Sequence, residues 1–333
     1  MQNDFESVQP ASVTPAELTG VGPHQQGAST VAILLATYNG ESFIAQQLMS
    51  FEQQTHPDWC VWASDDGSTD ATLRLLADCS QRWGAGKLRV LQGPSRGSTQ
   101  NFLSMVHNPV IQADYYAYSD QDDIWEADKL TRAVRWLSQQ PHGKPALYCS
   151  RTRLVDEAGR ELGVSPLFSR PPSFANALVQ NITGGNTMVF NDAARKLLMA
   201  VPLEVPVVIH DWWTYMVVTG AGGGVYFDAW PSVRYRQHDG NLIGMSVDGP
   251  SLATRVGNLC SSLYRRNGDI NIGALSHFRA WLSPDNARVF DLYANARRRW
   301  LLPRLVGVKR AGVYRLTLTG RLGLLAAVLL NKI

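Results

Sequence analysis

Short apolar runs alternate with amphipathic helical patterns from residue 31 to about residue 140. The runs are rich in β-branched and aromatic residues and are bounded by Gly, Pro, Asn and Asp, which is typical of strands. Strands that alternate with helices form an open, mostly parallel sheet covered by helices on both faces. We therefore predict an α/β fold whose first strands lie at 31–36, 60–64, 88–92 and 115–119.

The rest of the chain has two further patterns. Short β-type runs continue between about residues 146 and 236, at 145–150, 186–190, 223–228 and 232–236. After about residue 250 these runs disappear and the apolar residues recur at helical spacing. The sequence therefore predicts a sheet domain followed by a helical C-terminal region.

Charge is distributed unevenly along the chain, although the net charge is only +3. Residues 251–333 contain 14 Lys and Arg against 3 Asp, a formal charge of +11, which leaves −8 for the rest. The acidic part suits a site that gathers a divalent metal, and the basic part suits an anionic surface such as phospholipid headgroups. Nucleic acid is not expected as a partner, because the basic residues alternate with long apolar stretches rather than with stacking aromatics.

Several features predict a cytoplasmic protein. The first residues, MQNDFESVQP, carry acidic side chains where a signal peptide is basic. The four cysteines lie far apart, and we expect them to be reduced. The apolar run from Leu322 to Leu330 is shorter than the roughly 20 residues of a spanning helix. Residues 309–333 therefore either lie in a membrane interface, as a peripheral attachment, or pack on the preceding domain.

Two polar turns follow the first two predicted strands. They read ATYNG at 36–40 and SDDGSTD at 64–70. The carboxyl ends of parallel strands are where ligands bind in open α/β sheets. Ser68 or Thr69 can cap the following helix, but a cap does not require two consecutive aspartates. We expect these carboxylates to accept hydrogen bonds from a base or a ribose, so the turns form a nucleotide-binding loop.

An acidic segment, SDQDDIW at 119–125, follows the strand at 115–119. Its three carboxylates, Asp120, Asp122 and Asp123, are costly to hold together unless they share a cation. Mg²⁺ and Mn²⁺ take one or two protein carboxylates and fill the remaining positions with diphosphate oxygens and water. The alternative is a solvated turn that caps the next helix, a role that we expect above all for Asp123.

Together these motifs resemble family 2 glycosyltransferases of the GT-A fold, over about residues 31–240, and the SDQDDIW form is similar to the rhamnosyltransferase branch. The resemblance implies a Rossmann-like sheet and a nucleotide-sugar donor, either a dTDP- or a UDP-sugar. It implies that Asp120 lies toward the ribose and the metal, and that Asp122 is a direct ligand of Mn²⁺ or Mg²⁺. The nucleotide would be held by Thr37, Tyr38, Asn39, Asp65 and Asp66.

Two later segments are also similar to this branch. TGGNT at 183–187 would bring Gly184, Gly185 and Asn186 close to the donor, although paired glycines also form ordinary tight turns. IHDWW at 209–213 places Asp211 at the family's catalytic-base position at a helix start. The helix dipole would keep that carboxylate ionised and ready to accept a proton. An N-cap is the structural alternative for Asp211.

The last motif, YRQHDGN at 235–241, is similar to the closing segment of the family. It implies His238 as a third metal ligand, because neutral imidazole binds Mn²⁺. It also implies Arg236, or Arg234 beside it, as a counter-charge for the diphosphate.

Composition, the strand and helix patterns and the resemblance together predict a division of the chain. We expect a flexible leader over 1–29, a catalytic domain over 30–245 and a helical basic region over 246–333. The catalytic domain would consist of a nucleotide-binding half, 30–125, and an acceptor half, 126–245.

The implied reaction is an inverting transfer of L-rhamnose from dTDP-rhamnose to a hydroxyl of a bacterial surface glycan or a lipid-linked oligosaccharide. Another UDP-, dTDP- or GDP-sugar, such as galactose or glucose, is an alternative donor. A catalytically inactive glycan- or membrane-binding scaffold is a second alternative, which the retention of four acidic residues disfavours. A processive synthase would need several spanning helices, and a nucleotidyltransferase would usually have a Gly-rich basic loop after the first strand.

Overall fold

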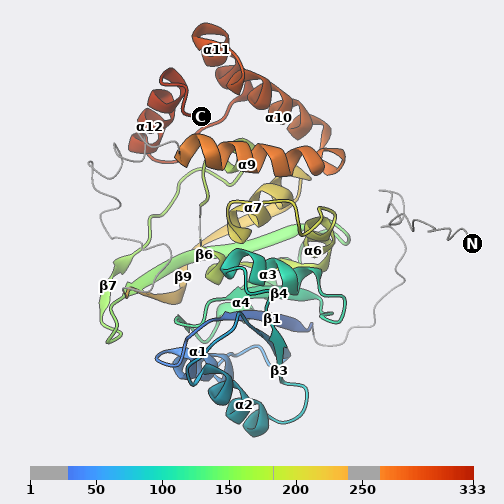
Figure 1. Cartoon of the computed structure of the whole chain (residues 1–333), viewed down its shortest axis with the longest axis vertical. Coiled ribbons are helices and arrows are strands. Elements are labelled where there is room, and N and C mark those ends of the chain that lie inside the picture. Colours follow the sequence, from blue (N-terminus) through green and yellow to red (C-terminus); the bar gives the residue numbers. More distant parts are fainter. Residues whose placement is uncertain (1–28, 183, 239–262) are drawn as a thin grey trace, which may run out of the picture.

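The structure, a computed structural model, describes residues 29–182, 184–238 and 263–333. Within these ranges nine strands form one sheet in the order β3-β2-β1-β4-β8-β6-β9-β5, with β7 paired to β6 (Figure 1). The strands are β1 Val31–Thr37, β2 Trp59–Asp65, β3 Leu88–Gln92, β4 Tyr115–Ser119, β5 Ile124–Trp125, β6 Ala146–Val155, β7 Glu161–Val164, β8 Val189–Asn191 and β9 Gly224–Arg236.

The two halves of the sheet differ in strand direction. Strands β1 to β4 pair with one another in parallel, with Thr37 beside Asp65 and Leu35 beside Ser119. In the second half, β8 is antiparallel to β4 and β6, β9 is parallel to β6, and β5 is antiparallel to β9. The prediction of a central sheet flanked by helices is confirmed, and strands β1 to β4 of the parallel part lie within residues 30–125, where we expect the nucleotide to bind.

Strand β9 combines two segments that the sequence predicts as separate strands. Its pairing with β6 shifts register around Arg151, which lies opposite Pro231. Proline has no N–H to donate, so it interrupts the hydrogen-bond ladder without ending the strand. The gap between the predicted segments at 223–228 and 232–236 is therefore an irregularity within one strand.

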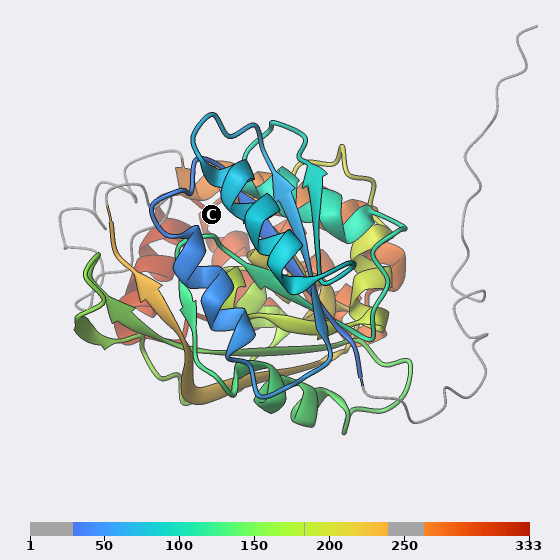
Figure 2. The same cartoon turned by 90° about the horizontal axis from the view of Figure 1, so that it is seen from below.

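Alternate residues of the strands face two hydrophobic clusters. In β1, Val31, Ile33 and Leu35 join one cluster, whereas Ala32 and Leu34 join the other. Figure 2 shows two helices of the first face, α1 and α2, lying across the sheet in blue and cyan. The first face is covered by α1 Ile44–Glu52, α2 Thr72–Trp83 and α4 Lys129–Leu137. The second face is covered by α3 Ser98–His107, α5 Phe174–Ala177, α6 Asp192–Met199 and α7 His210–Gly220.

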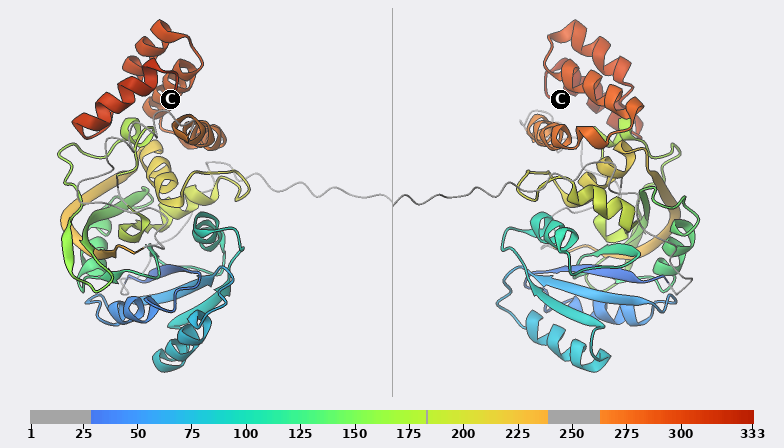
Figure 3. Two further views of the ribbon diagram at one scale, coloured as in Figure 1. Left: turned by 60° about the vertical axis from the view of Figure 1, so that its left-hand side comes forward. Right: turned by 90° about the vertical axis from the view of Figure 1, so that its right-hand side faces the viewer.

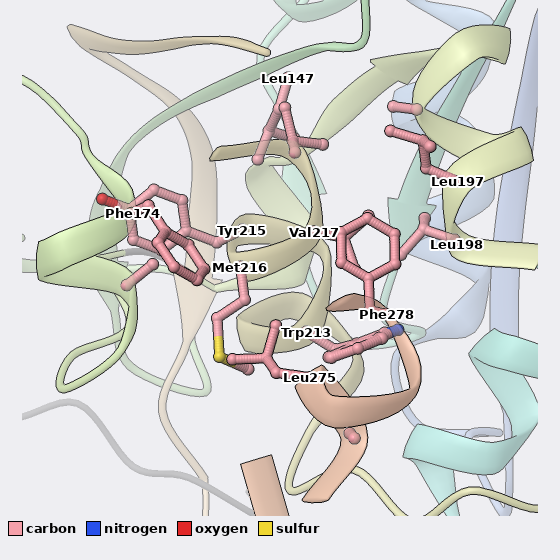
Figure 4. Packing of buried hydrophobic residues seen from close by; sticks show 14 of the residues in the cluster. Leu147, Phe174, Leu197, Leu198, Trp213, Tyr215, Met216, Val217, Leu275 and Phe278 are labelled. Carbon is pink, nitrogen blue, oxygen red and sulfur yellow. The ribbon is translucent and has the colours of Figure 1, made fainter. Parts of the chain in front are cut away.

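Helix α7 lies at the centre of the second cluster. Apart from Trp212, each of its residues is buried. Figure 4 shows Trp213, Met216 and Val217 packed among side chains of neighbouring helices, including Leu198 of α6 and Phe278. Such close packing fixes the position of the helix and of the residues at its N-terminus.

The C-terminal region is helical throughout the described residues, as predicted. Its residues Leu275 and Phe278 pack in the same cluster as α7, so this region shares the core of the sheet domain. Figures 1 and 3 show the C-terminal helices at the end of the molecule opposite α1 and α2. The helices are α9 Leu263–His277, the 3₁₀ helix η3 Arg279–Trp281, α10 Pro284–Arg297, α11 Leu301–Ala311 and α12 Leu318–Leu329.

Two expectations lie at or beyond the limits of the described ranges. The predicted leader falls almost entirely within residues 1–28, and the predicted boundary at 245/246 falls within 239–262, so both lie outside the described residues. Among the helices of the described ranges, none has the length and apolar character that crossing a membrane requires.

Candidate active site

The turns after β1 and β2 are joined by side-chain hydrogen bonds. Asp65 is buried, and its carboxylate accepts hydrogen bonds from Thr37 Oγ1 (2.9 Å), Ser68 Oγ (2.6 Å) and the backbone N–H groups of Gly67 and Ser68 (3.2 and 2.8 Å). A carboxylate has about four acceptor positions, so these donors use all of them. Asp65 therefore holds the loop in shape with Thr37 as a partner, and its contact with the nucleotide stays a prediction.

Compared with Asp65, the side chains of Asp66 and Asn39 have more capacity left to bind a ligand. Asp66 accepts the backbone N–H groups of Ser95 (2.7 Å) and Gly97 (2.8 Å), one on each oxygen, so each oxygen can still accept a ligand hydroxyl. Asn39 has a positive φ of 47° and accepts the Thr69 N–H at 2.8 Å. This left-handed conformation is one that asparagine tolerates better than most residues. Both side chains lie at the sheet edge where the nucleotide is expected.

Gln121 connects the first turn to the acidic segment. Its side-chain amide accepts from Tyr38 N and donates to Tyr38 O, both at 2.9 Å. This pair of bonds fixes the Tyr38 backbone, while the Tyr38 side chain remains 58% exposed. An exposed aromatic ring held at the strand end is available to stack on a base.

The acidic segment does not cap a helix. Strand β5 follows it directly, and α4 begins only at Lys129. Asp120 lies within electrostatic range of Asp122 and of Asp211 on α7. Burial, and then these two neighbouring carboxylates, raise the pKa of Asp120 to about 8. Three acidic side chains from two distant segments therefore converge at the carboxyl edge of β4.

Asp123, beside this group, is bonded within the protein. It is fully buried, and its carboxylate accepts from Asn186 Nδ2 at 2.6 Å. Burial, and then the neighbouring carboxylates of Asp122 and Asp120, raise the pKa of Asp123 well above its usual value. Asn186 is itself 4% exposed, and its contact with the donor stays a prediction. The expectation that Asp123 caps a helix is wrong, because α4 begins only at Lys129.

Asp122 and His238 form a candidate metal centre. His238 Nε2 lies 2.8 Å from Asp122 Oδ2, and the imidazole packs 4.9 Å from the Phe43 ring. A carboxylate and an imidazole are ligands that suit Mn²⁺, and diphosphate oxygens can complete its coordination. Over the described ranges, no three His, Cys, Asp or Glu side chains are arranged to hold a metal by themselves. The pair therefore fits a metal that is shared with a ligand.

Arg236 is buried and hydrogen-bonded within the chain. It is 2% exposed, and its guanidinium donates to the backbone carbonyls of Asp122 (3.1 Å) and Glu157 (2.6 Å) and to Gln46 Oε1 (2.5 Å). The neighbouring Arg234 pairs with Glu126 at 2.8 Å. The Arg236 side chain therefore fixes the backbone that carries Asp122, and its contact with a diphosphate stays a prediction.

Asp211 is the second residue of α7 and is held by three donors. Its carboxylate accepts from the backbone N–H groups of Gly185 (3.1 Å) and Trp212 (2.5 Å), and Asn181 donates from its side chain. The helix N-terminus alone would lower the pKa, but burial outweighs these donors and raises the pKa of Asp211 to about 6. At neutral pH the carboxylate is still ionised, and it is a stronger base than an exposed aspartate.

Gly185 makes this arrangement possible because a side chain would not fit. It begins the 3₁₀ helix η2, Gly185–Thr187, and a Cβ there would lie 2.5 Å from His210 Nε2 and 3.3 Å from Asp211 Cβ. Gly184 lacks such contacts, since its Cβ would meet only the Asn186 side chain. Residue 183, the first of the predicted motif, lies outside the described ranges.

Replacing Gly185 by alanine is expected to lower both stability and activity. The new methyl group must displace His210 or Asp211, and overpacking of this kind costs about 1–3 kcal/mol of unfolding free energy. Thermal melts and transfer rates would measure the two effects. Gly273→Ala is the matched control, because the structure leaves that Cβ free of contacts within 4 Å in a helix. Equal behaviour of the two variants would contradict the packing argument.

Three residues of the site were missed by the sequence analysis. Gln121 lies inside a predicted motif, but nothing in the sequence indicates that it binds Tyr38. Asn181 has no motif signal at all. His210 is buried and stacks on Phe102 at 4.0 Å, and burial lowers its pKa to about 3, so it stays neutral beside Asp211.

Comparisons with known proteins agree with this geometry. The model of the family described as "Glycosyl transferase family 2" matches residues 32–198. The dTDP-rhamnosyl transferase RfbG of Shigella flexneri is 27% identical over 241 residues, which cover 70% of this chain and 81% of that protein. An uncharacterised protein of Mycobacterium tuberculosis is 25% identical over 211 residues, covering 62% of this chain and 59% of that protein. The chain thus matches less than two thirds of the mycobacterial relative.

Solved structures show the same fold. Residues 1–349 of S. aureus TarS in complex with UDP-GlcNAc align with a TM-score of 0.52 at 16% identity, covering 86% of this chain and 93% of that one. The complex of the same protein with UDP gives a TM-score of 0.52 at 14% identity, covering 85% and 90%. These likenesses concern the arrangement of the sheet and helices.

Proposed function

Because the chain belongs to glycosyltransferase family 2, we propose that it transfers L-rhamnose from dTDP-L-rhamnose to a hydroxyl of a bacterial surface glycan or lipid-linked oligosaccharide, with inversion at the anomeric carbon. The observation that carries the proposal is the convergence of Asp120, Asp122 and Asp211 at one sheet edge. The sugar is suggested by the SDQDDIW motif and by the likeness to a dTDP-rhamnosyl transferase.

Asp211 is the proposed general base. Its carboxylate takes the proton of the acceptor hydroxyl, and the freed oxygen forms a bond to the anomeric carbon. The bond from that carbon to the diphosphate breaks on the opposite side, so the configuration inverts. Gly185, Trp212 and Asn181 hold the carboxylate in place, so little reorganisation is needed when the proton arrives.

The donor would lie along the edge formed by β1, β2 and β4. Tyr38 offers an exposed ring for the base, and Asp66 offers the acceptor capacity that its two backbone donors leave open. Asn39 and the backbone of Gly184 complete the proposed nucleotide contacts. Asp65 and Arg236 stabilise the loops of this edge through their hydrogen bonds within the chain.

Asp122 and His238 are the proposed ligands of Mn²⁺ or Mg²⁺, with Asp120 beside them. When bound, the cation would neutralise the charge of the departing diphosphate. Arg236 helps by fixing the Asp122 carbonyl, which keeps the ligand segment in register with β9. A second acidic side chain on the leaving-group side is then not required, in contrast with glycosidases.

A donor panel tests this proposal. The purified protein would be incubated with Mn²⁺ or Mg²⁺ and with dTDP-rhamnose, UDP-glucose, UDP-galactose or a GDP-sugar, and released nucleotide diphosphate would be measured with and without a glycan acceptor. We expect metal-dependent release of dTDP from dTDP-rhamnose alone. Release from a UDP- or GDP-sugar instead would replace the proposed donor. If no donor is turned over and none binds in calorimetry, the result would favour the inactive scaffold.

A further inference from the structure

Helix α12 exposes a stripe of leucines to solvent. Leu318, Leu322, Leu325 and Leu329 are 72%, 59%, 49% and 48% exposed. Their spacing of i, i+4, i+7 and i+11 places them on one face of the helix. The opposite face packs inward through Ala327 and Val328. The apolar face that a surface helix normally buries is therefore turned outward here.

Helix α11 adds apolar surface beside this stripe. Leu302 and Val306 are exposed, and so is Trp300 at the helix start. Arg304 joins the two helices, because its buried guanidinium donates to Val328 O at 2.9 Å and to Arg299 O. The exposed side chains of α11 and α12 thus belong to one packed unit, which we call the α11–α12 surface.

The charge of this unit is of one sign. Residues 298–333 contain eight Lys and Arg and no Asp or Glu. Five of the basic side chains are exposed, and none of the five forms an ion pair with another part of the chain that the structure describes. They are Arg298, Arg299, Lys309, Arg310 and Arg321.

The exposed leucines and the positive charge together indicate which kind of partner fits the α11–α12 surface. A second copy of this chain that packed the same surface against itself would bring two sets of like charges together, which is unfavourable. Anionic lipid headgroups complement the basic side chains, and the acyl region accepts the leucines. Tryptophan is also enriched at the level of the headgroups. Helix α12 has 12 residues and is too short to span, so it would lie in the plane of the membrane.

We propose that the α11–α12 surface binds a bilayer containing anionic phospholipid, with the α12 leucines inserted among the lipids and the basic side chains at the headgroups. This inference rests on the proposed function only for the nature of the acceptor, which would be lipid-linked. Binding needs neither donor nor metal, so it is measured separately from catalysis.

Cosedimentation of the full chain with vesicles tests the proposal. Vesicles of phosphatidylglycerol and phosphatidylcholine would be compared with vesicles of phosphatidylcholine alone, at low and high salt. We expect binding to the anionic vesicles that weakens about tenfold or more on pure phosphatidylcholine, and that falls as salt screens the headgroup charge.

The decisive variant is Leu322→Ser with Leu325→Ser. It should weaken binding to anionic vesicles at least about tenfold. The two leucines gain free energy when they move from water into the bilayer, and serines lose this gain. Leu167→Ser with Leu162→Ser is the matched control, since these leucines are similarly exposed, at 58% and 49%, and lie far along the chain from α12. Circular dichroism would verify that both variants are folded.

Three results would overturn the proposal. One is the absence of vesicle binding by the wild type. Another is equal loss of binding in the α12 variant and in its control, which would mean that any exposed leucine contributes. The third is a stable dimer in sedimentation equilibrium that the α12 substitutions dissociate, because the leucines would then be covered by a second copy.

Discussion

Asp211→Asn is expected to lower the rate of sugar transfer by about 10²- to 10⁴-fold, the usual contribution of a general base. The side chain keeps its size but loses the ability to accept a proton. One of its two backbone donors, Gly185 N–H or Trp212 N–H, would also lose a carboxylate oxygen as its partner. Transfer rates and donor binding would be measured together, and donor binding should remain close to that of the wild type.

The pH dependence of the wild type tests the same role. Because the protonated carboxyl cannot accept a proton, kcat/KM should fall about tenfold per pH unit below the pKa of Asp211, which is near 6, and should level off above it. The titratable group beside it is Asp120, whose pKa of about 8 leaves it mostly protonated near pH 6. The residual kcat/KM of Asp211→Asn should not show this rise between acidic and neutral pH.

Asp285→Asn provides the matched control. Asp285 is also the second residue of a helix, α10, but it is exposed and lies outside the site. Its substitution should leave the rate unchanged. If Asp211→Asn retains activity within tenfold of the wild type, or if Asp285→Asn falls equally, Asp211 is not the base and its role is to begin α7.

Asp122→Asn is expected to remove metal-dependent turnover of the donor, with a loss of about 10²-fold or more, because a metal supplies several kcal/mol of charge stabilisation. The substitution removes the negative charge that faces His238. Release of nucleotide diphosphate and calorimetric binding of Mn²⁺ with dTDP would be compared with the wild type. Metal-stimulated donor binding should be lost together with turnover.

Asp78→Asn is the control for this substitution, since Asp78 is an exposed aspartate on α2 and lies outside the site. A wild type whose activity is indifferent to chelators would contradict the metal proposal. Retention of metal-stimulated binding by Asp122→Asn would assign the metal to Asp120 instead.

The sequence predicted the parallel half of the sheet well for a physical reason. Strands that are buried on both faces appear as nearly continuous apolar runs, and β1, β2 and β4 are of this kind. Strands β5 and β7 were not predicted, because they have two and four residues, too few for any periodicity to register. Their positions depend on pairing with β9 and β6, which lie far away in the chain.

The site was predicted in position but not in its contacts. The motifs located the acidic edge, because parallel strands end together there. They did not distinguish a carboxylate that is open to a ligand from one whose oxygens already accept hydrogen bonds from the protein, such as Asp65. Arg236 donates to residues 79 and 190 positions away, and such partners cannot be inferred from local spacing. Asp211 was expected to be governed by the helix dipole, whereas the packing of α7 makes burial the larger effect.

The position of the C-terminal helices, opposite α1 and α2, has a consequence for kinetics (Figure 3). A chain held to a bilayer through α11 and α12 would keep its nucleotide-binding half away from the lipid, where it collects a water-soluble donor from three dimensions. Its acceptor would arrive by lateral diffusion in the two-dimensional plane of the membrane. The transfer rate would then follow the mole fraction of acceptor in the membrane, and adding inert lipid at constant bulk acceptor concentration would slow the enzyme by surface dilution.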